Sequence, residues 1–276
     1  MTRAEITDIF ARAGIDSPAE DAILLISGIE GISRADIAAD PARDYISCAL
    51  EKAVERRKSR EPLQYILGRW YFMNEEYEVS PECLIPRQET ELVAEKAAGL
   101  LPNGGILLDL CCGSGCIAVS VMEARPDCRA VAVDLFPETL RVAERNAERN
   151  GVADRVTFCR ADVLGGEHQI PDGRFDVIVS NPPYIRTADI GKLAPELGYE
   201  PKAALDGGTD GLDFYRSIVG NWISRLGNGG TMVLEIGADQ GKDVIAIASE
   251  KGTECCIIKD YSGLDRIAVL RKPETH

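Results

Sequence analysis

The stretch LLDLCCGSGCIA, residues 107–118, runs from an apolar segment through a glycine loop into a second apolar segment. This order is typical of a strand, a tight loop and a helix. Gly113 and Gly115 allow the backbone to approach a ligand where a Cβ atom would collide with it. Asp134 ends the next predicted strand, 19 residues after Gly115, and this spacing suits a carboxylate that binds two ribose hydroxyls. The stretch therefore predicts a nucleotide-type binding loop.

The loop is compatible with more than one cofactor. The spacing Gly113-x-Gly115-x-x-Ala118 fits the fingerprint of NAD-binding folds. It also fits the S-adenosylmethionine loop, in which Asp109 lies in the strand before the glycines. A tight strand-to-helix turn without a ligand is the third interpretation. The loop by itself leaves these alternatives open.

Apolar strands alternate with helices from Ile106 onward, and this alternation predicts an α/β fold with a mostly parallel sheet covered by helices on both faces. Right-handed crossovers place the C-terminal ends of parallel strands along one edge, where ligands bind near the switch point of the strand order. The predicted strands are Ile106–Cys111, Ala130–Asp134, Val156–Cys159, Asp176–Ser180, Thr231–Ile236, Cys255–Lys259 and Arg266–Leu270. The predicted helices lie near residues 115–124, 137–149, 211–225 and 239–250.

Residues 1–70 are predicted to form a small helical domain. One predicted helix has apolar residues at i, i+3, i+4 and i+7, namely Ile46, Ala49, Leu50 and Ala53. Ser17 followed by Glu20 forms a capping-box pattern, and Ser33 ahead of Asp36 indicates another helix start. Residues 71–86 are predicted to form a β-hairpin connector with its turn near Asn74, and residues 87–276 are predicted to form the α/β domain.

The composition of the chain disfavours several classes of protein. The chain has 276 residues, 45% apolar and 28% charged, which is a globular balance, and no apolar run approaches the roughly 20 residues of a membrane helix. The start has no signal-peptide pattern, so we expect a cytoplasmic protein. A net charge of −14 disfavours broad nucleic-acid binding. The nine cysteines contain no C-x-x-C pair, and only His168 and His276 add imidazoles, so we expect no metal site.

The stretch DVIVSNPPY, residues 176–184, is a buried-type strand that ends in Asn-Pro-Pro-Tyr, at the ligand edge of the predicted sheet. The prolines stiffen the turn and remove two backbone donors. The amide oxygen of Asn181 and the carbonyl of Pro182 can together accept both hydrogens of a planar NH2 group, while the ring of Tyr184 presses on a flat amide or base. Such acceptors stabilise a nitrogen that becomes positive as a methyl sulfonium approaches. The alternative interpretation is a rigid turn without chemistry.

At these motifs the sequence resembles the glutamine N5-methyltransferases of peptide chain release factors, the PrmC/HemK family. The resemblance extends over nearly the whole chain. The segments that carry it are PLQYILG at 62–68, LIPRQETE at 84–91, the loop around Asp109, DLFPE at 134–138, NPPYI at 181–185, EP at 200–201, ALDGG at 204–208, DGLDFY at 210–215, LEIG at 234–237 and QG at 240–241. The Asn-Pro-Pro-Tyr tetrad also occurs in adenine-N6 methyltransferases, but its combination with segments 62–68 and 84–91 is more specific.

The resemblance implies a Rossmann-like, seven-stranded class I S-adenosylmethionine-dependent methyltransferase domain behind a helical domain that helps seat the release factor. It implies methyl transfer to the glutamine of the release factor's Gly-Gly-Gln loop, by a monomer without direct nucleic-acid binding. It assigns cofactor binding to Asp109, Cys111, Cys112, Gly113, Ser114, Gly115, Asp134, Leu135, Asp162, Val163 and Asn181. It assigns the glutamine amide to Asn181, Pro182, Pro183 and Tyr184, with catalysis at Asn181, Pro182 and Tyr184, and supporting roles to Arg87, Thr90 and Glu91.

Two positions depart from the family pattern, which usually has glycine in place of Cys111 and proline in place of Gln88. Two other functions remain as alternatives: an adenine-N6 methyltransferase for DNA or RNA, and a binding module that keeps the fold without catalysis. A basic run at residues 52–60 is expected to be a solvated helix face, although it would also suit an acidic partner. Glu235, at a predicted strand end, fits either a site carboxylate or a paired structural one.

Overall fold

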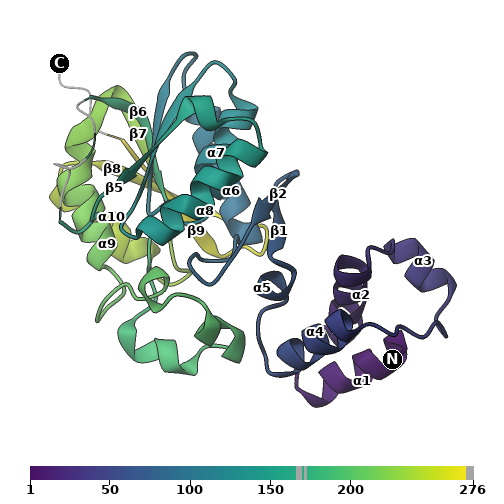
Figure 1. Ribbon diagram of the computed structural model, residues 1–276. Coiled ribbons are helices and arrows are strands. Elements are labelled where there is room, and N and C mark those ends of the chain that lie inside the picture. Colours follow the sequence, from purple (N-terminus) through teal and green to yellow (C-terminus); the bar gives the residue numbers. More distant parts are fainter. Residues whose placement is uncertain (166–169, 171–172, 272–276) are drawn as a thin grey trace. The chain divides into compact units, whose positions relative to one another are not determined.

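The computed structural model describes residues 1–165, 170 and 173–271, and the chain forms two compact units (Figure 1). The first comprises Met1–Trp70 together with Leu193–Glu200. The second comprises Tyr71–Lys192 and the described chain from Pro201 onward. The two histidines considered as metal ligands, His168 and His276, lie outside the described residues. No helix of the described chain is long and apolar enough to span a bilayer.

The first unit is a bundle of short helices around one apolar core. Its helices are α1 (Arg3–Arg12), α2 (Pro18–Glu30), α3 (Arg34–Ala39), α4 (Cys48–Lys58) and α5 (Leu63–Leu67). Phe10, Leu25 and Leu50 are fully buried in this core. The hydroxyl of Ser33 accepts a hydrogen bond from the Asp36 N–H at 3.1 Å and caps α3, as predicted.

Two local predictions for this unit are wrong. Ser17 is the N-cap residue of α2, but its side chain makes no capping bond, because its ψ of 62° lies outside the extended conformation from which an N-cap oxygen reaches the N–H groups of the first turn. Ile46 is 89% exposed rather than part of the apolar face, because Ser47 caps α4 and the helix begins only at Cys48. At α4 the cap formed by Ser47 decides where the helix begins.

Partly buried ion pairs join segment Leu193–Glu200 to the C-terminal end of α4 and to Arg60 just beyond it. Its 3₁₀ helix, η4 (Pro195–Tyr199), carries Glu196, whose carboxylate accepts hydrogen bonds from Arg57 at 3.0 Å and from Arg60 at 2.7 Å. Arg57 is 6% exposed and also binds Asp21 at 2.7 Å. The basic run is therefore only partly a solvated face, since its central arginine is buried and neutralised by carboxylates.

A seven-stranded sheet forms the centre of the second unit. Its strands are β3 (Ile106–Leu110), β4 (Arg129–Asp134), β5 (Val156–Arg160), β6 (Phe175–Ser180), β7 (Leu226–Glu235), β8 (Glu254–Lys259) and β9 (Asp265–Arg271). They lie in the order β5-β4-β3-β6-β7-β9-β8. All pairs are parallel except those that β9 makes with β7 and β8. The mostly parallel sheet predicted from the sequence is confirmed.

Helices cover both faces of this sheet (Figure 1). One core cluster joins α6 (Gln88–Leu100), α7 (Cys116–Ala124) and α8 (Pro137–Arg149) to sheet residues such as Leu107 and Val177. The other joins α9 (Asp213–Ser217), the π-helical turn Ile218–Trp222 and α10 (Gly241–Glu250) to their strand neighbours Leu108 and Ile178. Alternate strand residues thus enter opposite cores, which explains why the strands are apolar throughout.

The short strands β1 (Arg69–Phe72) and β2 (Glu75–Glu78) pair as a hairpin, and Met73 in its turn has a φ of 54°. Short 3₁₀ turns occupy Ala153–Arg155, Thr187–Lys192, Lys202–Ala204 and Ile223–Arg225. The strand order reverses between β3 and β6, where Leu110 pairs with Ser180. The residues that follow, Cys111 and Asn181, therefore leave neighbouring strands at the switch point, where this class of sheet binds ligands.

Candidate active site

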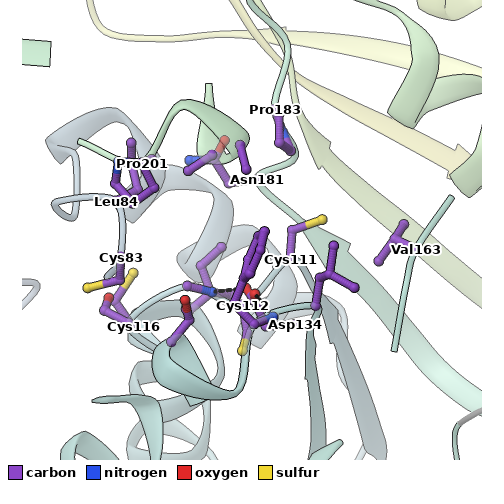
Figure 2. A pocket seen from close by; sticks show the side chains of 18 of the residues that line it. Cys83, Leu84, Cys111, Cys112, Cys116, Asp134, Val163, Asn181, Pro183 and Pro201 are labelled. Carbon is purple, nitrogen blue, oxygen red and sulfur yellow. Dashed lines mark hydrogen bonds between the residues drawn. The ribbon is translucent and has the colours of Figure 1, made fainter. Parts of the chain in front are cut away.

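A cavity lies beyond the C-terminal ends of β3, β4, β5 and β6 (Figure 2). It brings together most of the residues that the sequence singled out: Arg87, Thr90, Cys111, Cys112, Gly113, Ser114, Asp134, Leu135, Asp162, Val163, Asn181 and Pro183. Five others lie outside its lining: Glu91, Asp109, Gly115, Pro182 and Tyr184. The wall also includes Pro201, Ala203, Ala204 and Phe214, which the sequence analysis did not select for this role.

A glycine stands at position 113 and at position 115 for different structural reasons. Gly113 has a φ of +55°, and among the described atoms none lies within 4 Å of the place a Cβ would take, so this side of the loop is open to the cavity. Gly115 has a φ of +79°, and its Cβ would lie 3.0 Å from the Cβ of Ala143 in α8. Gly113 therefore leaves open space beside the loop, whereas Gly115 lets α7 pack closely on α8.

Cys111 has a left-handed backbone with a φ of +59°, a conformation that favours glycine. This geometry gives a physical reason for the glycine usual in the family at this position. Burial raises the pKa of the Cys111 and Cys112 thiols well above the ordinary value and that of Cys116 to about 12, so these thiols are neutral. In the part of the chain that the structure describes, no group of three or more His, Cys, Asp or Glu residues is arranged to hold a metal ion.

Asp134 links the end of β4 to the glycine loop. One carboxylate oxygen accepts the Gly113 N–H at 3.1 Å, and the other accepts the Phe136 N–H at 3.1 Å. Burial raises the pKa of Asp134, and these N–H donors oppose that shift. Each oxygen keeps a second lone pair for hydroxyls of a bound ligand.

Asp109, in strand β3, connects this strand to helix α7 on the other side of the glycine loop. It is fully buried and accepts the Ala118 N–H at 3.1 Å, at the start of α7. Burial raises the pKa of this carboxyl to about 8. Its second oxygen and the hydroxyl of Ser114 are both buried without a hydrogen-bond partner among the described residues. Because Ser114 lines the cavity, its unpaired hydroxyl fits a site that binds a polar ligand.

A hydrogen-bond chain holds the Asn-Pro-Pro-Tyr turn. The amide nitrogen of Asn181 donates to the Thr90 hydroxyl at 3.0 Å, and this hydroxyl donates to Glu235 at 2.6 Å. The hydroxyl of Tyr184 donates to the other oxygen of Glu235 at 3.3 Å. Glu235 is 1% exposed, and burial raises its pKa while its hydroxyl donors and Arg266 oppose the shift. The buried carboxylate at the end of β7 thus belongs to the site.

Gln240 holds the backbone of the Asn-Pro-Pro-Tyr turn by hydrogen bonds. Its amide nitrogen donates to the carbonyls of Tyr184 at 3.0 Å and Gly211 at 3.1 Å. A Cβ at Gly211 would lie 2.5 Å from the Tyr184 carbonyl oxygen, and a Cβ at Gly207 would lie 2.7 Å from the Tyr184 Cα. These glycines are needed because the backbone passes so close. The segments around 204–213 and 234–241 therefore serve as the support of the turn.

Of the three residues predicted to support the site, two lie at the cavity and one binds the hairpin. Thr90 contacts Asn181 directly, and Arg87 is the N-cap residue of α6 and lines the cavity. Glu91 instead accepts the Met73 N–H at 2.7 Å and fastens the turn of the hairpin. The residues that follow Arg87 form α6, although Gln88 stands where the family usually has proline.

Comparisons with known proteins agree with this architecture. Residues 2–68 match the family model of the PrmC N-terminal domain, and residues 90–208 match that of the methyltransferase small domain. The release factor glutamine methyltransferase of Geobacter sulfurreducens is 40% identical over 262 residues, covering 93% of this chain and 90% of the relative. The chain belongs to the release factor glutamine methyltransferase family. The family resemblance seen in the sequence is thereby confirmed.

Another relative supports the same family assignment, and a solved structure shows the same fold. The release factor glutamine methyltransferase of Moorella thermoacetica is 36% identical and covers 96% of this chain and 95% of its own. A methyltransferase from Pyrococcus furiosus is 24% identical, covers 70% of this chain and 86% of its own, and superposes with a TM-score of 0.52, which shows the fold. The chain is thus a Rossmann-like methyltransferase of class I with a helical N-terminal domain.

Proposed function

We propose that this protein transfers a methyl group from S-adenosylmethionine to the side-chain amide nitrogen of the glutamine in the Gly-Gly-Gln loop of peptide chain release factors. The observation that carries the proposal is the placement of Asn181 at the switch point of the sheet, with its amide nitrogen bound to Thr90. Its amide oxygen remains to accept from a substrate NH2 group. Family membership supplies the class of reaction and of substrate.

The cavity residues suit the proposed cofactor. The open side of Gly113, the unpaired Ser114 hydroxyl and the Asp134 carboxylate provide a polar cradle beside the apolar side chains of Leu135 and Val163. Asp162 and the loop residues Cys111 and Cys112 complete this wall. When bound, S-adenosylmethionine supplies an electrophilic methyl group on a sulfonium centre.

The chain's own residues then act by positioning and electrostatics. The Asn181 oxygen and the Pro182 carbonyl accept the two hydrogens of the glutamine amide, and Pro183 keeps this turn stiff. These bonds strengthen as the nitrogen becomes positive, so they favour the transition state over the ground state. Tyr184 is held by Glu235 and Gln240, and in this proposal its ring orients the planar amide. No side-chain base is required, because a methylated amide nitrogen is acidic enough to lose its proton to water.

Mass spectrometry of a release factor incubated with this protein and S-adenosylmethionine tests the proposal. We expect one added methyl group on the loop glutamine, and none when that glutamine is replaced by asparagine, whose amide is one methylene shorter. Duplex DNA and RNA serve as parallel substrates for the adenine-N6 alternative. Methylation of nucleic acid without methylation of the release factor would contradict the proposal. Absence of cofactor binding in calorimetry would favour the non-catalytic module.

The proposed substrate also suggests where and how the protein acts. Release factors function in translation termination, so we propose that methylation takes place in the cytoplasm. The net charge of −14 supports recognition of the protein substrate rather than of nucleic acid. We propose a monomer whose helical domain, residues 1–70, helps to seat the release factor and is joined by residues 71–86 to the catalytic domain at 87–276.

A further inference from the structure

The hydrogen bonds from Glu235 to Asn181 have a fixed direction. Tyr184 and Thr90 each direct a hydroxyl at a different oxygen of Glu235, at 3.3 Å and 2.6 Å, so the buried carboxyl group accepts on both sides. Thr90 is the donor in its bond to Glu235, so the carboxyl group gives this hydroxyl no hydrogen. The single hydrogen of the Thr90 hydroxyl is therefore committed to Glu235, and its oxygen can only accept from Asn181.

This direction determines how the Asn181 amide is turned. Only the NH2 end of the amide can donate to the Thr90 oxygen, and the two atoms are 3.0 Å apart. The oxygen end must then point away from Thr90. The two ends of an asparagine amide are nearly identical in shape, so packing alone hardly distinguishes them, and the hydrogen-bond network decides.

We propose that Glu235, acting through Thr90, is a positioning residue that turns the Asn181 oxygen toward the substrate and so selects a carboxamide over a carboxylate. This inference rests on the proposed function, because it concerns the group that the site methylates. An oxygen facing the substrate accepts from the NH2 of glutamine. A reversed amide would present its own NH2 and would instead suit the carboxylate of glutamate.

A purely structural role makes a different prediction. Thr90 lies in the first turn of α6 and Glu235 at the end of β7, 145 residues apart, so their bond also fastens a helix to the sheet. If fastening were its only task, removing it would lower stability and overall activity. It would leave the preference for glutamine over glutamate unchanged.

Three variants separate the two roles. Thr90→Val keeps the shape and removes the hydroxyl, and Thr90→Ser keeps the hydroxyl and serves as the matched control. Glu235→Gln introduces an amide that can donate to Thr90 and so reverse the chain. For Thr90→Val and Glu235→Gln we expect kcat on the release factor to fall about 10- to 100-fold, with little change in the dissociation constant for S-adenosylmethionine. Thr90→Ser is expected to stay within about threefold of the parent, since its hydroxyl restores the same acceptor.

The deciding measurement is specificity. Release factors with glutamine or glutamate at the loop position compete for the enzyme, and their inhibition constants give the preference of each variant. We expect the preference for glutamine to fall at least about tenfold in Thr90→Val and Glu235→Gln, and to persist in Thr90→Ser, because one misdirected hydrogen bond is worth about that factor. An unchanged preference in the first two variants, or an equal loss in Thr90→Ser, would overturn the inference.

A second readout needs no substrate. The ¹⁵N resonance of the Asn181 side-chain amide, recorded in the full-length protein, is expected to shift in Thr90→Val and to remain in place in Thr90→Ser. If it does not move in Thr90→Val, the inference fails even where methylation is normal. If the parent protein does not methylate the release factor, the proposed function fails, and this resonance still decides whether Thr90 directs the amide. Should Glu235→Gln not fold, Thr90→Val carries both measurements.

Discussion

The Asn181 amide donates a hydrogen bond to the Thr90 hydroxyl at 3.0 Å, although 91 residues separate the two in the sequence. Asn181 follows strand β6, and Thr90 lies in the first turn of α6. A side chain on a turn is thereby anchored to a rigid helix. Such anchoring matters because acceptors that are already oriented need no rearrangement in the transition state.

Replacing this asparagine is the most direct test of the site. We expect Asn181→Ala to lower kcat on the release factor about 100-fold or more, since it removes an acceptor that acts in the transition state. Calorimetry should show binding of S-adenosylmethionine within about threefold of the parent, because such a change alters little in ground-state affinity. Asn221→Ala, on the π-helical turn and outside the cavity lining, is the control. Normal turnover by Asn181→Ala would refute its role.

The two loop glycines offer a matched pair of alanine variants. Both have positive φ angles, so the backbone strain of an alanine is similar at each. At Gly113 the new methyl group enters open cavity space, and we expect weaker binding of S-adenosylmethionine, by about tenfold or more, with a modest loss of stability. At Gly115 it meets Ala143 at 3.0 Å, and we expect a further destabilisation of about 1–3 kcal/mol from overpacking.

Urea unfolding and calorimetry on both variants measure these effects. A second substitution tests whether contact with Ala143 causes the loss of stability in Gly115→Ala. Ala143→Gly removes the methyl group that the new side chain would meet, so the double variant should regain part of the lost stability. Equal cofactor affinity in Gly113→Ala and the parent would show that this glycine does not face the ligand.

The sheet could be predicted from the sequence because its determinants are local. The run 177–179 is apolar and turn residues follow shortly after it, so both the strand and the position of Asn181 at its end follow from the pattern. The link from Thr90 to Glu235 has no such signal, because it joins two residues that meet only after the sheet and α6 have packed together. Segment Leu193–Glu200 was missed for the same reason, since Glu196 finds Arg57 and Arg60 only in the folded unit.

Cys111 shows where this chain differs from its family. Its φ of +59° lies in the left-handed region, where a Cβ atom costs about 1 kcal/mol or more. We expect Cys111→Gly to be more stable to urea than Cys111→Ala by about 1 kcal/mol, because the two variants lack the same thiol and differ only in this Cβ. The comparison removes the effect of thiol packing. Equal stability would mean that the loop relaxes to another backbone conformation.

Asp109 predicts how stability depends on pH. Burial raises the pKa of its carboxyl in the folded protein to about 8, whereas an unfolded aspartate has a pKa of about 3.9. Between these values the folded state holds a proton that the unfolded state has lost, so the free energy of unfolding falls as the pH rises through this window. Below this pH window the carboxyl group is protonated in both states, so it no longer changes the free energy of unfolding with pH.

Asp109→Asn isolates this effect, because the amide resembles the neutral carboxyl and does not titrate. Burial also raises the pKa of Asp21, Glu123, Asp134 and Glu235, and these groups are present in both proteins. Of the four, Asp134 interacts electrostatically with Asp109, so the contributions of the other three cancel in the comparison. Urea unfolding between pH 5.5 and 8 should show the variant gaining stability relative to the parent by about 1 kcal/mol per pH unit. Parallel curves for Asp109→Asn and the parent would mean that Asp109 is already ionised in the folded protein, with its unpaired oxygen compensated by an ordered water.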